Sequence, residues 1–282
     1  MPAPPFPIPA HLYTNCNNLL TSLGLSPNQV RVVLYKDADS GRPDDGPGLA
    51  PIPSSGFVDC ATSYSGQPPY PDACNLMHNM GGAARTVKGV YPNVQQMFVH
   101  SRIYGGYANP NDSAGNYFQR LNPEPFAYEH GFAMKWFIQA QIDEVKHGTV
   151  NPVTGPLNYN QAPWIDWGAY LWAAGKWIPC NNCGWSPSLT WSQDVLGPAG
   201  CVSNGPPSEE CDFQATFGNM VPAPPDNTHP SNCGRDKVSK MLVYQYCNGV
   251  VPTETYMQPW LVPPGSGSCY ATKPTQCDYL PQ

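Results

Sequence analysis

The sequence predicts an α/β fold with a parallel sheet, because two apolar runs of the strand type flank one helical pattern. Val30 to Tyr35 is a short apolar run of the buried-strand type, and Val94 to His100 is a second. Between them, Leu76 to Lys88 carries apolar residues at helical spacing. A strand, a helix and a strand in this order form a parallel unit.

Two further helices are predicted outside this unit. His11 to Leu23 has leucines on one side and Gly24 as its stop. Glu124 to Val145 is the strongest helical pattern, and Pro125 suits its first turn. Its apolar face consists of Ala133, Trp136, Phe137, Ala140 and Ile142.

Long segments rich in proline and glycine separate these elements, since the chain has 35 Pro and 26 Gly. Residues 1–10 form a proline-rich lead, and residues 249–282 form a proline-rich tail. Residues 11–248 would then form the α/β domain, with loop insertions at 41–75 and 179–225. Loops of that length inside a compact domain are usually functional or insertions.

Composition limits the classes of partner. The net charge is −6 and only 12% of the residues are charged, which argues against an electrostatic nucleic-acid binder. No apolar run reaches the roughly 18 residues that a membrane span needs. Eight Trp, 16 Tyr and nine Phe are too many core-type side chains for a disordered chain.

The chain has 11 cysteines, which points to an oxidising compartment and therefore to a secreted protein. Four pairs are spaced to close local loops, although sequence does not fix connectivity: Cys60 with Cys74, Cys201 with Cys211, Cys233 with Cys247, and Cys269 with Cys277. Because the count is odd, one thiol is free or pairs outside the chain. The first residues lack the basic start and apolar core of a signal peptide, which suggests a trimmed N-terminus.

Cys180 and Cys183 have the spacing of a redox or zinc motif. The chain offers no matching second pair for a four-ligand zinc site, so a structural disulfide is the preferred interpretation. We expect no metal and no cofactor.

A turn-rich loop near residue 230 carries the main catalytic candidates. Asp226 and His229 lie three residues apart, so the carboxylate can bond one ring nitrogen and leave the other facing outward. A histidine held in this way is a general base. The alternative is a surface turn that caps the helical pattern beginning near Val238.

The Asp-x-x-His-Pro loop, followed by a glycine and a helix, resembles the last block of the SGNH (GDSL-type) hydrolases. Other stretches are similar to a group of secreted bacterial SGNH-like proteins that has no settled reaction; they lie at 30–39, 101–108, 122–136 and 162–172. The resemblance covers most of residues 16–246. It implies a three-layer α/β sandwich with a parallel sheet, as in flavodoxin-like folds, with long disulfide-pinned loops.

The resemblance also implies a Ser-His-Asp triad in which His229 is the base and Asp226 orients it. The family's nucleophile belongs to a Gly-Asp-Ser block, and this chain contains none. Val30 to Tyr35 resembles the third block, so the first block is expected to lie outside this chain or to be replaced. Ser40 is the best internal candidate, because it lies beside Gly41 just after a strand. The alternative is that Asp39, Ser40 and Gly41 form a turn.

The candidate substrate-binding residues are Lys36, Asp39, Arg102, Tyr104 and Trp167. Arg102 ends an apolar strand, and its guanidinium could hold a carboxylate or an oxyanion, or form a structural ion pair. Lys36 and Asp39 occupy the third-block position, where they would shape the oxyanion region. Tyr104 follows Arg102 in the same stretch.

An aromatic-rich stretch follows residue 163. Its rings could stack on sugars or fill a core; they are Trp164, Trp167, Tyr170, Trp172 and Trp177.

Two functions of different classes remain open. The first is a secreted hydrolase of the esterase or deacetylase type, acting on a small-molecule or polysaccharide ester. The second is a non-catalytic extracellular binding or structural protein on the same scaffold, which the missing Gly-Asp-Ser favours. An activated serine beside His229 would separate them.

Overall fold

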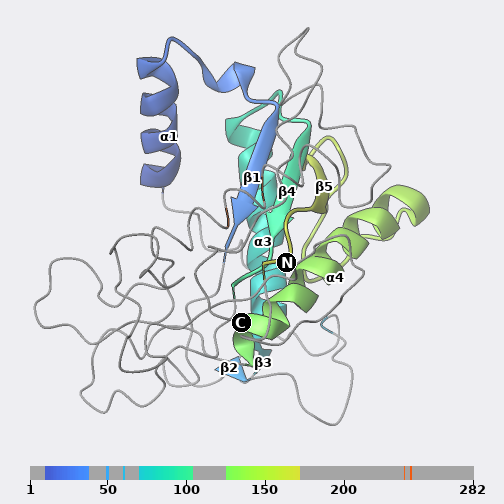
Figure 1. Cartoon of the computed structure of the whole chain (residues 1–282). Helices are drawn as coiled ribbons and strands as arrows, with labels where there is room; N and C mark the ends of the chain where they lie inside the picture. The colour runs from blue at the N-terminus through green and yellow to red at the C-terminus, as the bar shows by residue number, and fades with distance from the viewer. Residues whose placement is uncertain are drawn as a thin grey trace, which may run out of the picture. The chain divides into compact units, whose positions relative to one another are not determined.

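The computed structural model describes residues 10–37, 49–50, 60, 70–103, 125–171, 238 and 242. By compactness the chain divides into two units, residues 1–101 with 129–168, and residues 102–128 with 169–282. The elements in chain order are α1 (Ala10–Ser22), the 3-10 turn η1 (Pro27–Gln29), β1 (Val32–Lys36), β2 (Leu49–Ala50), β3 (Tyr70–Pro71), α3 (Asp72–Val90), β4 (Gln96–His100), α4 (Phe126–His147) and β5 (Trp164–Trp167) (Figure 1).

The main sheet is parallel and has the strand order β1-β4-β5. In its register Lys36 lies opposite His100, and Val99 lies opposite Trp167. The short strands β2 and β3 form a separate parallel pair. The predicted α/β fold with a parallel sheet is therefore confirmed.

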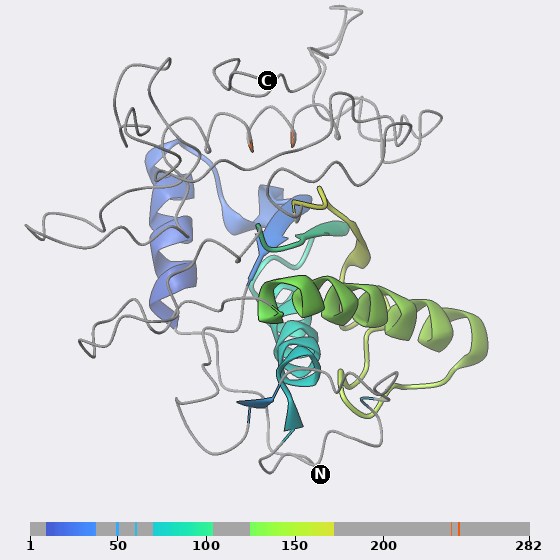
Figure 2. The ribbon, with the colours of Figure 1, turned by 60° about the horizontal axis from the view of Figure 1, so that its bottom comes forward.

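Helices α3 and α4 cover the same face of the sheet (Figure 2). The chain steps from β1 to β4 and then to β5 in one direction, and right-handed crossovers in one direction place their helices on one face. Met97 and Val99 of β4 and Ile165 of β5 point into the core cluster that these helices close. Tyr35 and Trp167 pack at the margin of this cluster.

A second cluster joins α1 to the end of α3. Val87, Tyr91 and Val94 are buried there, and Tyr13 meets Tyr91 edge to face at a centroid distance of 6.2 Å. Gly24 has φ +72° just beyond α1, which confirms the predicted stop because a left-handed residue ends a helix. Among the described cysteines, Cys16 on α1 is exposed and free.

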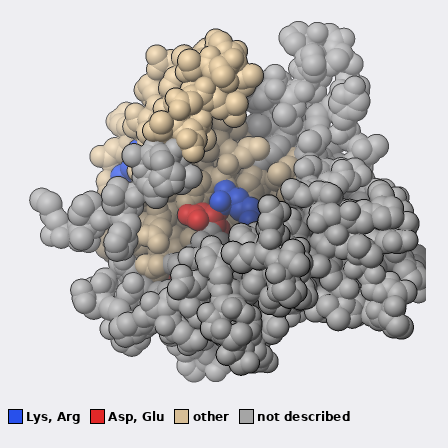
Figure 3. Space-filling model, turned by 90° about the vertical axis from the view of Figure 1, so that its left-hand side faces the viewer, with Lys and Arg blue, Asp and Glu red and all other residues tan. Residues whose placement is uncertain are grey.

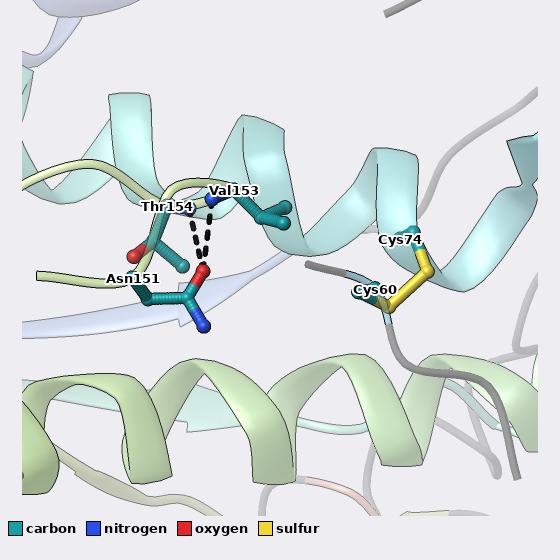
Figure 4. The surroundings of a disulfide bond; sticks show 5 residues. All are labelled: Cys60, Cys74, Asn151, Val153 and Thr154. Atoms are coloured by element: carbon teal, nitrogen blue, oxygen red, sulfur yellow. Dashed lines mark hydrogen bonds between the residues drawn. A yellow bond between two sulfur atoms is a disulfide. The ribbon is translucent and has the colours of Figure 1, made fainter. Parts of the chain in front are cut away.

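A disulfide joins Cys60 to Cys74 with an S–S length of 2.02 Å (Figure 4), so this predicted pair is confirmed. It fixes the start of α3 to the preceding chain. The other predicted pairs lie outside the described residues. No helix of the described ranges is long and apolar enough to cross a membrane.

The structure departs from the predicted elements at α3 and β5. Helix α3 begins at Asp72, before the predicted Leu76. Its interior Gly81 lies against the backbone of Thr154, where a Cβ would come within 2.3 Å of the carbonyl oxygen. Strand β5 was not predicted, because four residues do not show a periodic pattern.

The connection from α4 to β5 is held by one buried amide. The Gln141 side-chain Nε2 donates to the carbonyls of Leu157 and Pro163, each at 2.8 Å. Its Oε1 accepts from the backbone N–H of Ile165 at 2.7 Å. Glu144, one turn further along, accepts from the Asn158 side chain at 2.9 Å. This irregular segment therefore has its buried backbone groups satisfied by α4, as burial requires.

We predict that Gln141→Leu lowers the free energy of unfolding by about 2 to 4 kcal/mol, because it leaves two carbonyls and one N–H buried without their partner. Urea denaturation followed by tryptophan fluorescence measures this. The control is Gln139→Leu on the same helix, since Gln139 is exposed and bonds only to Asp143 in the described contacts. Equal losses in the two variants would contradict the role of Gln141.

Candidate functional site

Polar side chains gather where β1 and β4 end. Lys36 ends β1 and is followed by Asp37, while His100 ends β4 and is followed by Ser101. In open parallel sheets, ligands bind beyond the carboxyl ends of the strands. This edge is therefore the candidate functional site in the described part of the chain.

The carboxylate of Asp37 is held by the preceding strand. The Tyr35 hydroxyl donates to Asp37 Oδ2 at 2.5 Å. Burial raises the pKa of Tyr35 well above its usual value, and the negative charge and hydrogen bond of Asp37 raise this pKa further. Tyr35 therefore stays protonated and keeps donating to the carboxylate.

His100 ends the central strand and is 3% exposed. Its imidazole lies against Gly168, where a Cβ would come within 2.2 Å of the ring Nδ1. The N–H of Gly168 donates to the carbonyl of Val99 at 2.7 Å, which extends the pairing of β4 and β5 by one residue. Gly168 does not have a positive φ, so its backbone conformation does not require glycine. Glycine is needed there because a side chain would collide with the His100 ring.

Lys36 and His100 lie opposite each other at this edge. Paired residues of parallel strands point to the same face, and here that face is opposite to the one with Tyr35 and Val99. The imidazole of His100 is buried, whereas Lys36 is exposed, so its positive charge can meet a ligand. Lys36 could therefore bind a negatively charged oxygen.

The predicted site residues lie in different places. Lys36 reaches the edge of the sheet, and Trp167 is partly buried at the margin of the core. Arg102 is buried and belongs to the second unit. Five candidates lie outside the described residues: Asp39, Ser40, Tyr104, Asp226 and His229.

Sequence reasoning did not select His100, Gly168 or the Tyr35–Asp37 bond. A histidine that ends an apolar strand was the available signal for His100. The contact of His100 with Gly168 joins residues of two strands, and their spacing in sequence gives no sign of it.

A second aspartate–histidine pair lies inside the core. His130 Nε2 of α4 is 2.8 Å from Asp72 Oδ2, and both side chains are fully buried. A substrate cannot reach this pair, so it ties the first turn of α3 to α4. The described ranges contain no group of three or more His, Cys, Asp or Glu side chains that could hold a metal ion.

Figure 3 shows one side of the molecule, where acidic and basic side chains lie next to each other on the described surface.

We predict that Gly168→Ala destabilises the protein by about 1 to 3 kcal/mol, because the new methyl group overpacks against the His100 ring. In a His100→Ala background the same change should cost less, since the ring is gone. Chemical denaturation of the four proteins of this cycle measures the coupling.

Gly89→Ala is the control for this cycle, because a Cβ at residue 89 of α3 meets nothing within 4 Å. That change should stabilise by up to about 1 kcal/mol. An unchanged cost of Gly168→Ala in the His100→Ala background would contradict the packing argument.

We predict that Asp72→Ala lowers the free energy of unfolding by about 3 to 5 kcal/mol, because it leaves a buried imidazole without its carboxylate. Asp143→Ala on the surface of α4 is the control and should change stability by less than about 0.5 kcal/mol. Thermal and urea unfolding of both variants measure these changes in stability. A small effect at Asp72 would show that the pair does not tie the helices.

Comparison of the chain with protein-family models, with curated proteins and with solved structures found no match. The SGNH-like resemblance therefore stays a prediction from sequence motifs. Hydrolase activity and secretion stay predictions with it.

Proposed function

We propose that this chain is a secreted esterase-type hydrolase on an SGNH-like, three-layer α/β scaffold. The observation that carries the proposal is the sequential parallel order β1-β4-β5. The flavodoxin-like order is 2-1-3-4-5, in which the last three strands are also sequential. This supports β1 as the third strand of such a sheet, the position that the resemblance gives to Val30 to Tyr35.

The catalytic residues of the proposal come from the loop near residue 230. Asp226 orients His229, and His229 takes the proton of a serine as its Oγ attacks the ester carbonyl. The proton then passes to the leaving alcohol, and water cleaves the acyl-enzyme with His229 again as base. Ser40 is the serine that this chain offers, four residues beyond the end of β1.

Two described residues support the helix that follows this loop. Val238 and Leu242 are both helical and half-buried. Residues four apart lie on the same face of a helix, so both can pack toward one core. This matches the loop-then-helix order on which the resemblance depends.

Substrate binding is assigned to Lys36, Asp39, Arg102, Tyr104 and Trp167. Lys36 supports this part best, because it is exposed at the carboxyl edge beside His100. Its charge would stabilise the negative oxygen of the carbonyl during attack. The substrate class is an acyl or acetyl ester on a small molecule or a polysaccharide. The Cys60–Cys74 disulfide supports an oxidising compartment.

The second candidate function is a non-catalytic binding or structural protein on the same scaffold. The observation that favours it is the absence of Gly-Asp-Ser in the sequence. It predicts no activated serine in the folded chain.

Fluorophosphonate labelling of the purified chain tests the proposal, because the reagent reacts only with an activated serine. We expect one adduct by intact mass, placed by peptide mapping, and its loss in His229→Ala. The control is His147→Ala, since His147 is exposed at the end of α4 and should leave labelling unchanged.

The mapped peptide also decides on Ser40. An adduct on another serine would keep the hydrolase proposal and reject Ser40 as the nucleophile. The absence of any adduct in well-folded protein would overturn the hydrolase proposal and favour the binding protein.

A further inference from the structure

Two aromatic rings are exposed together, one on the loop that leads into β5 and the other on the first residue of this strand. Tyr159 is 45% exposed and Trp164 is 42% exposed. Their ring centroids are 5.5 Å apart and their planes meet at 36°. We call Tyr159 and Trp164 the aromatic pair. Contiguous exposed apolar surface on a folded protein marks an interaction site more often than a single exposed ring does.

The backbone that displays the aromatic pair is fixed on both sides. Before Tyr159, the Asn158 side chain is bonded to Glu144 of α4. After it, the N–H of Ala162 donates to the Asn158 carbonyl at 2.9 Å. The N–H of Trp164 donates to the Gln95 carbonyl at 2.8 Å. A ligand that binds such a fixed pair loses little free energy to ordering the loop.

The core beneath the loop does not need these rings. Leu157, Ala162 and Ile165 are buried here, and all three belong to the core cluster. Trp164 points to the face of β5 opposite Ile165, because successive strand residues alternate. The aromatic pair therefore exposes apolar surface to water, which is unfavourable, and it does not fill the interior. A binding role would explain this exposure.

The segment that carries the aromatic pair is polar and has no charged residue of its own, and the charged groups next to it include two carboxylates, Asp166 of β5 and Glu144 of α4, which is bonded to Asn158. Residues 148–165 contain no Asp, Glu, Lys, Arg or His. Asn160 and Gln161 are exposed beside the rings and offer amide donors and acceptors. Single-stranded nucleic acid also stacks on aromatic rings, but it requires a positively charged groove along its backbone. This segment has no cation of its own, and the single guanidinium of Arg85, which donates to the Thr154 carbonyl, does not make such a groove.

A neutral polysaccharide has the complementary chemistry. The C–H face of a pyranose ring packs on an aromatic ring, and its hydroxyls bond to amides and to a tyrosine hydroxyl. We propose that Tyr159 and Trp164, with Asn160 and Gln161, form a binding surface for a neutral polysaccharide. This surface lies at the start of β5, about 13 Å along the strand from Gly168 at about 3.3 Å a residue. It does not depend on the proposed hydrolase activity.

Affinity electrophoresis of the full chain tests this. Native gels would contain xylan, galactomannan, hydroxyethyl cellulose or dextran, with a non-binding protein as the mobility reference. We expect retardation by at least one of these polymers. Trp164→Ala and Tyr159→Ala should each weaken the association by about tenfold, which is within the range found when an aromatic side chain that stacks on a nucleic-acid base is removed.

Val150→Ala is the matched control, because Val150 is an exposed apolar residue of the same loop and should leave retardation unchanged. Trp164→Phe keeps a flat ring and should retain most of the binding, which covers the case that Trp164→Ala fails to fold. Melting curves verify the fold of every variant.

Absence of retardation in all four polymers would overturn the proposal. So would retardation that Trp164→Ala and Tyr159→Ala both leave unchanged. Retardation by heparin or poly(dT) that depends on the aromatic pair would overturn it as well, because both polymers are anionic. Hydrolase activity does not enter any of these measurements.

Discussion

The buried amide of Gln141 is the interaction on which the described sheet depends most. Strand β5 follows a long segment without helix or strand, and besides its pairing with β4 it is held by bonds from Gln141 of α4 to that segment and to Ile165. If Ile165 lost its bond to Gln141, the register of β5 against β4 would be weakened at its first buried residue. Everything that β5 positions would then shift, including Gly168 against His100 at the far end of the strand.

In the described ranges, Gly81 and Gly168 are needed because a side chain would not fit there, and neither has a positive φ. Gly81 lets the Thr154 backbone touch α3, and Gly168 lets the His100 ring lie on the backbone after β5. Both contacts join segments that are distant in sequence. In each case a methyl group would force apart two packed elements, which is costly in an interior as dense as that of a protein.

Strand β5 separates two kinds of surface chemistry. Its carboxyl end lies beside the buried His100 of β4, and the exposed Lys36, which suits a negatively charged oxygen, lies beyond β4 on β1. Its amino end displays two aromatic rings among neutral amides, which suit an uncharged ligand with an apolar face. An enzyme that works on a polymer needs both a reacting site and a surface that holds the chain, and the two proposals are compatible in this sense.

The sequence by itself determined the local features: the apolar strands β1 and β4, the helices α1, α3 and α4, and the Gly24 stop, while the spacing of Cys60 and Cys74 indicated a pair that the structure contains. Each of these depends on neighbours in the chain, so periodicity and spacing reveal it. Only the tertiary structure decided that β5 is a strand, that His100 rests on Gly168, and that Trp164 is exposed while Trp167 packs at the core. The physical reason is that burial and close contact depend on which segments, distant in sequence, pack against each other. The pattern of a single sequence does not show these long-range contacts.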